Sequence, residues 1–474
     1  MTPAQSSLID DVRARFGAKA AIVDRDAIAP WETDWRGKYH GHAPAILSPA
    51  DRDEAAAIVA MAHATNVALV PQGGNTSMVG GATPPVDGSA LILSTRRMNR
   101  IRSLDADAGL AVAEAGVILS NLHDAALAAG RRFPLTLGAR GSATIGGLVS
   151  TNAGGTQVLR WGTMRGLVAG VEAVLPDGSL YEGLAALKKD NRGYDLNQLL
   201  IGAEGTLGLV TAATLRLAPA IHGRTVAWAG LDSPHAALTL LRRLQAATDA
   251  VESFEILSGD SLGRVLRHIP ATRAPLASEH RWHVLIEAVA ANADDEPPAA
   301  LLERLLAPAL AEGVAGDAVI AASEAQAEAL WKIRESLPEA ERAAGPASQH
   351  DVSVPVAAMP DFMIDAARTV EARFPGTTAT AFGHLGDGNV HFHVRAPAGT
   401  SKEAWEEGDA PAATRLVHDL VVAAGGSISA EHGIGQMKRA ELERLTPPAR
   451  LAALRAVRHA LDPAGLFNPG KLVT

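Results

Sequence analysis

The hydrophobic and polar positions in the first half of the chain change repeatedly between a helical and an extended period. Residues 51–66, DRDEAAAIVAMAHATN, begin with an acidic turn and continue with apolar residues at helical spacing, which predicts a helix. The residues after it, VALVPQGGNTSMVGGA, predict a strand that breaks into a glycine-rich loop. Residues 90–130 predict strand, turn, strand and helix. Short Val/Leu/Ala runs bounded by Gly over residues 131–217 predict short strands with tight connections.

The pattern changes after Pro219. Residues 235–250 and 299–313 are rich in Ala and Leu and predict helices, whereas RTVAWAGL and HRWHVLIEAVA predict strands. This alternation favours an α+β domain built on an antiparallel sheet. From about residue 410 the pattern is mostly helical and ends in a looped tail.

Length and composition narrow the class of protein. A chain of 474 residues is long enough for two or three packed units. The formal net charge of −9 argues against a general nucleic-acid binder, which needs a basic surface. Because the sequence has no Cys, redox chemistry requires an organic cofactor or a metal held by nitrogen and oxygen ligands. No secretory signal or membrane-spanning run is recognisable, so we expect a cytoplasmic protein, with a peripheral membrane contact left open.

Three glycine clusters have the composition of anion-binding loops. They cover residues 71–81, 138–155 and 202–208, and each comes after an apolar run. Glycines let consecutive backbone N–H groups approach a diphosphate, and Ser, Thr and Asn add donors. One such cluster is as well explained as a plain turn, but three within one region favour a nucleotide. Neither a Rossmann Gly-x-Gly-x-x-Gly after a strand nor a P-loop occurs.

The segment HLGDGNVHFH, residues 384–393, has the pattern of a histidine-rich turn. Asp387-Gly388 is a strong signal for a two-residue hairpin, whose register sets His384 opposite His391. Cross-strand partners lie about 4.5–5.5 Å apart at Cβ, close enough to share one metal ion. An irregular loop in place of this turn could also bring the two rings together. His393 lies on the same face as His391, so the third ligand is either His393 or an acid from elsewhere. A single buried His is more often a core residue than a ligand.

Several long motifs resemble the FAD-linked D-2-hydroxy-acid dehydrogenases of the vanillyl-alcohol-oxidase-like flavoprotein superfamily. This family includes D-2-hydroxyglutarate and D-lactate dehydrogenases, and the resemblance covers nearly the whole chain. The motifs, in the family's order, are PQGGNTSMVGGATP, LGARGSATIGGLVSTNAGGT, KKDNRGYDLNQLLIGAEGTLGLVTAATLRLAP, FGHLGDGNVHFHV, SISAEHGIGQMK and LDPAGLFNPGKL.

The resemblance implies an α+β fold with three parts. Residues 1–219 are expected to form an FAD-binding domain of the vanillyl-alcohol-oxidase type. Residues 220–415 are expected to form an antiparallel-sheet substrate (cap) domain with the metal site. Residues 416–474 are expected to form a C-terminal helical segment that returns to the FAD.

The same resemblance implies the residues that line the FAD. The first glycine loop is expected to wrap the diphosphate, the second to line the cofactor, the third to lie near the adenosine end, and the tail to return to the flavin. In chain order these residues are Pro71, Gln72, Gly73, Gly74, Asn75, Thr76, Ser77, Gly80, Gly81, Pro134, Gly138, Ser142, Gly146, Gly147, Thr151, Asn152, Gly154, Glu204, Gly205, Gly208, Val210 and Asn468. Where the family's usual DNTGYDL has Thr, this chain has Arg192.

Family members with HLGDGN-x-H and AEHG bind a divalent metal, typically Zn, and the ligand set suits Zn or Mn. The matching residues are His384, His391 and Glu431. We expect His432 to act as general base, because a neutral imidazole suits that role near neutral pH. Flavin N5 would accept the hydride from C2 of the hydroxy acid.

The substrate contacts show where this chain departs from the family. Arg334, in WKIRESLPEA, resembles the arginine that clamps the substrate carboxylate. In SQHDVSVPV, Gln349 takes the place of a family lysine, and His350, His393 or an arginine are the candidates to take over the contact of that lysine.

D-2-hydroxyglutarate is the favoured substrate, with D-lactate, D-malate or a bulkier D-2-hydroxy acid as alternatives. An electron-transfer flavoprotein or a quinone is the implied acceptor, and a homodimer is one candidate assembly.

Two hypotheses from other classes stand beside this one. A zinc hydrolase that uses His384, His391 and Glu431 leaves the glycine clusters unexplained, and no His-Glu-x-x-His occurs. A non-catalytic nucleotide-binding module leaves the histidines unexplained.

Overall fold

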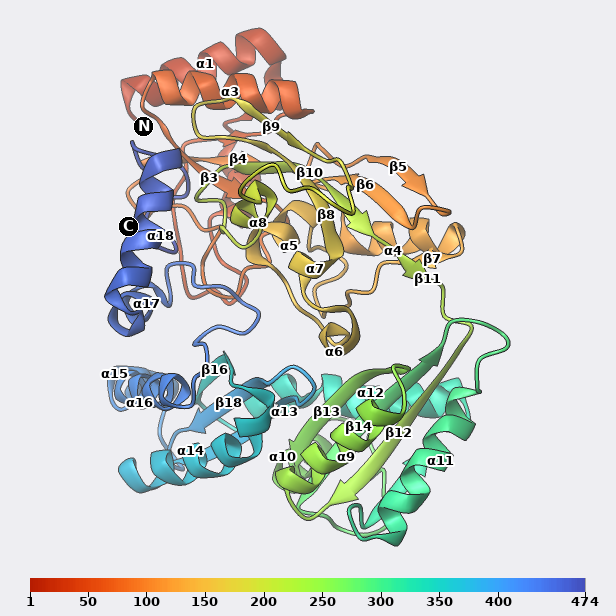
Figure 1. Ribbon diagram of the computed structural model, residues 1–474. Coiled ribbons are helices and arrows are strands. Elements are labelled where there is room, and N and C mark those ends of the chain that lie inside the picture. The colour runs from red at the N-terminus through yellow and green to blue at the C-terminus, as the bar shows by residue number, and fades with distance from the viewer. Residues whose placement is uncertain (474) are drawn as a thin grey trace. The chain divides into compact units, whose positions relative to one another are not determined.

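The computed structural model describes residues 1–473, which form two compact units (Figure 1). Unit 1 consists of Met1–Gly155, Trp161–Ala220 and the segment that begins at Glu431. Unit 2 consists of Thr156–Arg160 and Ile221–Ala430. The segment expected to start at residue 416 therefore belongs to unit 2 as far as Ala430, and only the residues from Glu431 onward belong to unit 1.

Unit 1 is built on three sheets. A four-stranded sheet has the order β1-β2-β4-β3, in which β4 is parallel to both of its neighbours. A five-stranded antiparallel sheet has the order β5-β6-β10-β8-β9, and β7 pairs with β11. The strands are β1 Ala21–Ile22, β2 Ile46–Leu47, β3 Ala68–Gln72, β4 Ala90–Ser94, β5 Ile101–Asp105, β6 Leu110–Glu114, β7 Arg131–Arg132, β8 Val168–Val174, β9 Leu180–Gly183, β10 Leu209–Arg216 and β11 Ala218–Pro219.

The helices of unit 1 confirm the helical patterns of the sequence. Asp51 caps α3, and its carboxylate accepts from the amides of Asp53 and Glu54, as the acidic first turn predicts. The helices are α1 Pro3–Phe16, α2 Arg25–Ile28, α3 Arg52–Ala64, α4 Leu119–Ala128, α5 Ile145–Thr151, α7 Met164–Leu167, α8 Leu196–Leu200, α17 Arg439–Leu445 and α18 Pro448–Leu461.

Unit 2 is built on one seven-stranded antiparallel sheet, of order β15-β12-β14-β13-β17-β18-β16, as the sequence predicts for this region. The strands are β12 Gly223–Leu231, β13 Val251–Ser258, β14 Trp282–Ala290, β15 Asp317–Ile320, β16 Ala347–Ser353, β17 Thr378–His384 and β18 Asn389–Arg395. The helices are α6 Val158–Trp161 (whose last residue belongs to unit 1), α9 Pro234–Ala247, α10 Gly259–His268, α11 Pro298–Ala311, α12 Glu324–Glu335, α13 Leu337–Ala343, α14 Met359–Arg373, α15 Lys402–Glu407 and α16 Ala410–Ala423.

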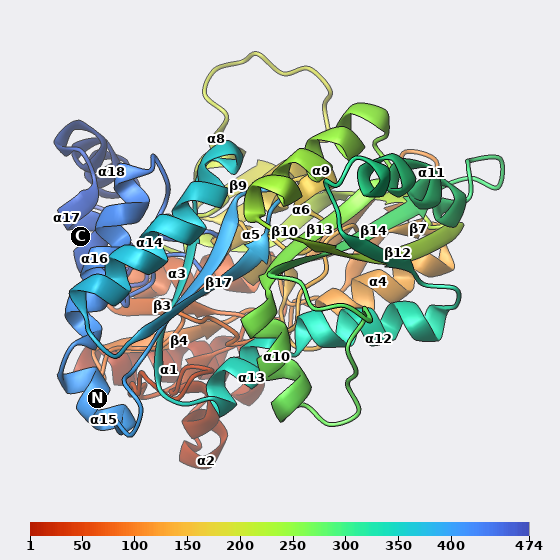
Figure 2. The same ribbon diagram turned by 90° about the horizontal axis from the view of Figure 1, so that it is seen from below.

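The two faces of this sheet have different chemistry. Helices α9, α11 and α14 cover one face, and α10, α12 and α13 lie against the other (Figure 2). Because side chains alternate along a strand, Phe254 and Ile256 of β13 enter the apolar core under α9. Glu255 between them points to the opposite face, where Leu257 and Phe382 pack beside polar side chains. This second face carries the candidate active site.

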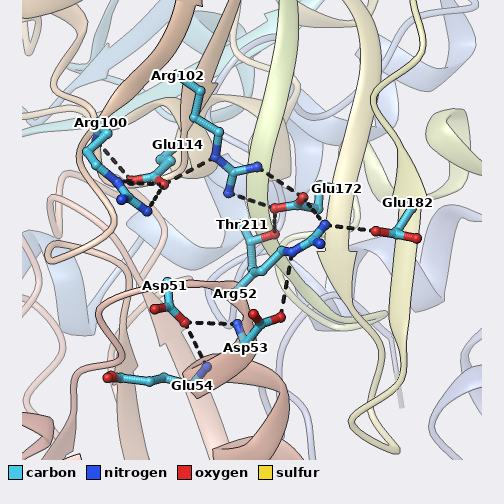
Figure 3. A network of polar contacts seen from close by, with 10 residues as sticks. All are labelled: Asp51, Arg52, Asp53, Glu54, Arg100, Arg102, Glu114, Glu172, Glu182 and Thr211. Atoms are coloured by element: carbon cyan, nitrogen blue, oxygen red, sulfur yellow. Dashed lines mark hydrogen bonds and ion pairs between the residues drawn. The ribbon is translucent and has the colours of Figure 1, made fainter.

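A buried ion-pair network ties the five-stranded sheet of unit 1 to its neighbours (Figure 3). Glu172 on β8 has almost no exposed surface and accepts from Arg102 at 2.9 and 3.0 Å, Arg52 at 2.8 Å and the Thr211 hydroxyl at 2.8 Å. Arg102 also donates to Glu114 on β6 at 3.2 Å. One carboxylate thus joins the start of helix α3 to three strands of the sheet.

The network keeps the Glu172 carboxylate ionised. Burial alone raises its pKa, but hydrogen bonds from Arg102, Thr211 and Arg52 outweigh burial, and the pKa lies below its ordinary value near 4.5. A carboxylate with a lowered pKa stabilises the folded state above its unfolded pKa, and this contribution is lost as the pH falls through the folded pKa.

No helix within residues 1–473 is long and apolar enough to cross a bilayer.

We predict that Glu172→Gln lowers the free energy of unfolding at pH 7 by about 1.5–3 kcal/mol, the range for hydrogen bonds to charged groups. The variant should lose less stability than the wild type between pH 6 and pH 3, because it lacks the carboxylate that becomes protonated. Urea denaturation at a series of pH values measures both effects. Glu182→Gln is the control, since Glu182 pairs with Arg52 at 2.8 Å but is largely exposed, and it should cost under about 1 kcal/mol. Equal losses in the two variants would contradict the role of the buried network.

Candidate active site

The β17–β18 hairpin carries the histidines, but its register differs from the sequence prediction. The strands are joined by a four-residue loop, residues 385–388, and His384 pairs with Asn389 while His391 pairs with Phe382. The prediction of a two-residue turn with His384 opposite His391 is therefore wrong. Tertiary contacts explain the difference: Leu385 is fully buried in the core, and the Gly388 carbonyl accepts from the amide of Val354.

His384 and His391 nevertheless lie side by side. Their rings are 5.5 Å apart between centroids at an interplanar angle of 76°. They meet because the partner of His384 is two residues before His391, so the two side chains are diagonal neighbours on one face. The Phe382 ring lies 5.2 Å from His391 and 5.1 Å from His393, so all three histidines share this face.

Glu255 is a buried partner of both His384 and Arg334 that the sequence analysis missed. Its Oε1 lies 2.6 Å from Nδ1 of His384, and its Oε2 accepts from Nε of Arg334 at 2.7 Å. Burial raises the pKa of Glu255, but Arg334 and His384 outweigh burial, and the pKa is lowered. The signal was present in the sequence: a carboxylate inside the apolar run FEIL must find a cation when the strand is buried.

Arg334 is placed by helix α12 with its charge toward this face. Ser323 caps the helix through the amide of Gln326, and Arg334 lies in its last turn. The side chain is buried, and its guanidinium lies 5.6 Å from the Phe382 ring centroid. Only Nε has a hydrogen-bond acceptor among residues 1–473, so the donors of both Nη groups are unused within this part of the chain.

His391 lies near Asp351 of β16, with 3.8 Å between Nδ1 and Oδ1. Asn389 donates to the same Asp351 oxygen at 2.9 Å. In the adjoining loop, burial raises the pKa of Asp387. Three carboxylates therefore lie near the histidine pair: Glu255 of β13, Asp351 of β16 and Asp387 of the loop.

His393 and His350 lie on opposite faces of the sheet. His393 is next to Gln349 across the β16–β18 ladder, and its Nδ1 is 3.9 Å from Glu341, a buried carboxylate that also accepts from Arg264 at 3.1 Å and from Arg395. His350 bonds through Nδ1 to the Phe392 carbonyl and through Nε2 to the Thr414 hydroxyl. Because neighbouring residues of a strand face opposite ways, His350 points away from the His384 face.

The first two glycine loops pack closely in unit 1, where all the predicted FAD residues lie. A side chain at Gly74 would bring its Cβ within 1.9 Å of the Ser142 carbonyl oxygen. In the stretch from Gly73 to Thr76, the backbone N–H groups have no hydrogen-bond partner within the described chain. Thr144 Oγ1 is buried and likewise without a partner among residues 1–473. Unused donors in a glycine-lined loop fit a diphosphate.

Glu204, from the third glycine loop, holds the segment just after Glu431 and His432. Its carboxylate accepts from the amides of Ile434 and Gly435, each at 2.7 Å. Burial raises the Glu204 pKa against these two bonds. The loop thereby fixes the backbone two residues after His432, the predicted base.

Asn468 joins the tail to the glycine loops. Its side-chain amide donates to the carbonyls of Gly81 at 2.9 Å and Glu204 at 2.7 Å. Its buried Oδ1 has no partner in the described part of the chain. Glu204, Asn468, Asn75 and Asn152 all have positive φ, between 44° and 54°, a conformation that functional loops often retain.

The remaining predicted FAD residues lie around these loops. Pro71 and Gln72 end β3, Gly146, Gly147 and Thr151 belong to α5, and Val210 is on β10. The predicted residues in the connecting loops are Ser77, Gly80, Pro134, Gly138, Gly154, Gly205 and Gly208.

Two family models match the chain, and the boundary between the two matches lies near Ala220, where unit 1 passes into unit 2. The second match also includes the residues of unit 1 that follow Glu431. Residues 43–183 match the family described as FAD binding domain. Residues 222–472 match the family described as FAD linked oxidases, C-terminal domain.

Two relatives identify the family more closely. D-2-hydroxyglutarate dehydrogenase, mitochondrial, of Arabidopsis thaliana is 35% identical over 97% of this chain and 80% of its own length. D-2-hydroxyglutarate dehydrogenase of Xanthomonas citri pv. viticola is 36% identical over 93% of this chain and 91% of its own. The chain belongs to the FAD-linked D-2-hydroxy-acid dehydrogenases. The dehydrogenase is therefore an FAD-dependent oxidoreductase, which excludes both the hydrolase and the non-catalytic hypotheses. Its cytoplasmic location stays a prediction, since the plant relative is named as mitochondrial.

A solved structure supports the fold. The structure of p-cresol methylhydroxylase has a TM-score of 0.77 and 14% identity, and the match covers 99% of this chain and 97% of that one. The vanillyl-alcohol-oxidase type of fold predicted from the sequence is confirmed.

We predict that Gly74→Ala weakens FAD binding, because the added methyl group forces the first glycine loop away from Ser142. An extra methyl group in a well-packed site costs about 1–3 kcal/mol. If this cost falls on the FAD-bound conformation of the loop, the affinity for FAD falls roughly 5–150-fold. Flavin absorbance per protein after dialysis measures the loss. Gly141→Ala is the control, because an added Cβ there meets nothing within 4 Å, and it should keep full flavin content. Full flavin in Gly74→Ala would contradict the close packing.

Proposed function

We propose that this dehydrogenase oxidises a D-2-hydroxy acid to the 2-oxo acid, with D-2-hydroxyglutarate as the favoured substrate. The names of the two relatives support this substrate. The observation that carries the proposal is the cluster of His384, His391 and Arg334 on one face of the unit 2 sheet. Unit 1 is proposed to bind FAD, and unit 2 to bind the substrate.

We further propose a divalent metal, Zn or Mn, held by His384, His391 and Glu431. The two imidazoles are near enough to share an ion. Nδ1 of His384 is engaged by a carboxylate, which makes Nε2 the ligand atom, an arrangement common in metal-binding histidines. Nitrogen and oxygen ligands suit either metal.

Each residue of the proposed site has one task. When bound, FAD supplies the hydride acceptor and the metal supplies a Lewis acid. Arg334 holds the C1 carboxylate of the substrate through its two Nη groups, because a bidentate guanidinium fixes a planar carboxylate. His432 removes the proton of the 2-hydroxyl group, as a neutral imidazole can near pH 7.

The far end of the substrate is proposed to meet His393 and Gln349. These residues are cross-strand partners, and His393 is two residues after His391 on β18, on the same face of the sheet. Gln349 brings a neutral amide where the family has a lysine, so D-lactate, D-malate and bulkier D-2-hydroxy acids remain alternatives. An electron-transfer flavoprotein or a quinone is the proposed electron acceptor.

We predict that the purified protein carries FAD and that its visible absorption bleaches anaerobically on addition of D-2-hydroxyglutarate. The L enantiomer should leave the spectrum unchanged, since C2 would present its hydrogen to the wrong side. Stopped-flow absorbance with D-2-hydroxyglutarate, D-lactate and D-malate ranks the substrates. Colourless protein that does not take up FAD, or flavin that no D-2-hydroxy acid bleaches, would contradict the proposed function.

We predict that His384→Ala retains FAD but loses the metal, and that substrate bleaches its flavin at least about 100-fold more slowly, as removal of several kcal/mol of Lewis-acid stabilisation requires. Elemental analysis and the bleaching rate measure the two effects. His283→Ala is the control: His283 is a buried histidine of the same sheet that bonds to Nε1 of Trp228 at 3.1 Å, and its loss should leave metal content unchanged. A His384→Ala protein with full metal content would contradict the proposed ligand set.

A further inference from the structure

Glu255 is the one carboxylate that contacts both a proposed metal ligand and the proposed substrate clamp within residues 1–473. Its side chain is fully buried in the middle of β13. Each of its oxygens has one of these partners, His384 at 2.6 Å and Arg334 at 2.7 Å. The two partners come from separate elements, since His384 ends β17 and Arg334 lies in the last turn of α12.

The hydrogen bonds determine which atoms remain available to ligands. An ionised carboxylate only accepts, so a neutral His384 must carry its proton on Nδ1, and its lone pair for a metal is then on Nε2. Arg334 donates to Glu255 through Nε, which turns the guanidinium so that both Nη groups remain for a carboxylate. One side chain therefore sets the tautomer of the histidine and the orientation of the arginine.

We propose that Glu255 is a positioning residue that fixes the metal-binding tautomer of His384 and, with the same carboxylate, the orientation of Arg334. The dehydrogenase would thus hold its metal and its substrate carboxylate at a set spacing. That a metal binds His384 and that a substrate carboxylate binds Arg334 rest on the proposed function. The tautomer itself does not depend on that function.

The same sheet offers a matched control in Glu287. This carboxylate on β14 is also buried and accepts from Arg224 Nε at 2.7 Å and from Trp331 Nε1 at 2.7 Å. Trp331 lies one turn before Arg334 on α12. Replacing Glu287 therefore removes a similar pair of bonds from the same sheet and helix without changing a contact of His384.

We predict that Glu255→Gln lowers metal affinity by about 10–100-fold, the usual cost of losing an outer partner of a metal-bound histidine. If the amide oxygen of glutamine accepts from Arg334, its NH2 group faces Nδ1 of His384, which must then accept. The ring proton moves to Nε2 and blocks the ligand atom. Competition with a chromophoric chelator on the FAD-loaded protein gives the metal affinity, and the KM for D-2-hydroxyglutarate should also rise.

Glu287→Gln should change metal affinity less than about threefold, and Glu255→Asp, which keeps the carboxylate, should recover part of the loss. Thermal unfolding of all variants shows whether they are equally folded. Equal metal affinity in Glu255→Gln and the wild type would overturn the proposal. So would equal loss in Glu255→Gln and Glu287→Gln, because the effect would then be general destabilisation.

Ring-¹⁵N NMR of histidine-labelled, metal-free protein separates this proposal from the proposed function. The His384 signals, assigned by their absence in His384→Ala, should show the proton on Nδ1 in the wild type and on Nε2 in Glu255→Gln. A wild type that binds no metal but shows this tautomer change would contradict the metal site and retain the role of Glu255. A proton on Nε2 in the wild type would overturn the role of Glu255.

Discussion

A carboxylate buried on a sheet must be paired with hydrogen-bond donors, at least one of them a cation, and this constraint organises both units of the dehydrogenase. An unpaired buried charge costs more free energy than most folds can spare. In unit 1 Glu172 is therefore paired with Arg102 of β5 in the same sheet and with Arg52 of α3. In unit 2 Glu255 draws in Arg334 and His384 in the same way. The first pairing uses all the nitrogens of Arg102, whereas the second leaves both Nη groups of Arg334 without an acceptor among the described residues.

The difference between the two pairings lies in what the cations have left to donate. Arg102 divides its donors between Glu172 and Glu114, so none of its nitrogens is unused. Arg334 uses only Nε among the described residues, and its partner carboxylate holds a histidine by the other oxygen. A site that recognises an anion needs donors that the fold has fixed but not used. The N–H groups of the first glycine loop meet the same condition, because they have no partner among the described residues and the absence of a side chain at Gly74 lets the loop pack against Ser142.

Much of the fold was predictable because it is encoded locally. The acidic first turn and apolar spacing predicted α3, the segments RTVAWAGL and HRWHVLIEAVA predicted β12 and β14, and the long glycine motifs indicated the flavoprotein family. Glu255 was missed because one Glu in an apolar strand does not reveal which distant cation it meets. His350 was grouped with the substrate residues by its place in a motif, yet strand alternation turns it to the opposite face.

The sequence by itself determined the family, the cofactor class, the antiparallel sheet of unit 2 and the three histidines at its hairpin, because motif order and side-chain periodicity are properties of the chain alone. Only the tertiary structure decided how those histidines meet. Burial of Leu385 and the bond from Val354 lengthen the loop to four residues, so His384 and His391 become diagonal neighbours rather than direct partners. Contacts between residues more than a hundred positions apart then decide which ring nitrogen carries the proton, as the bond between Glu255 and Nδ1 of His384 does.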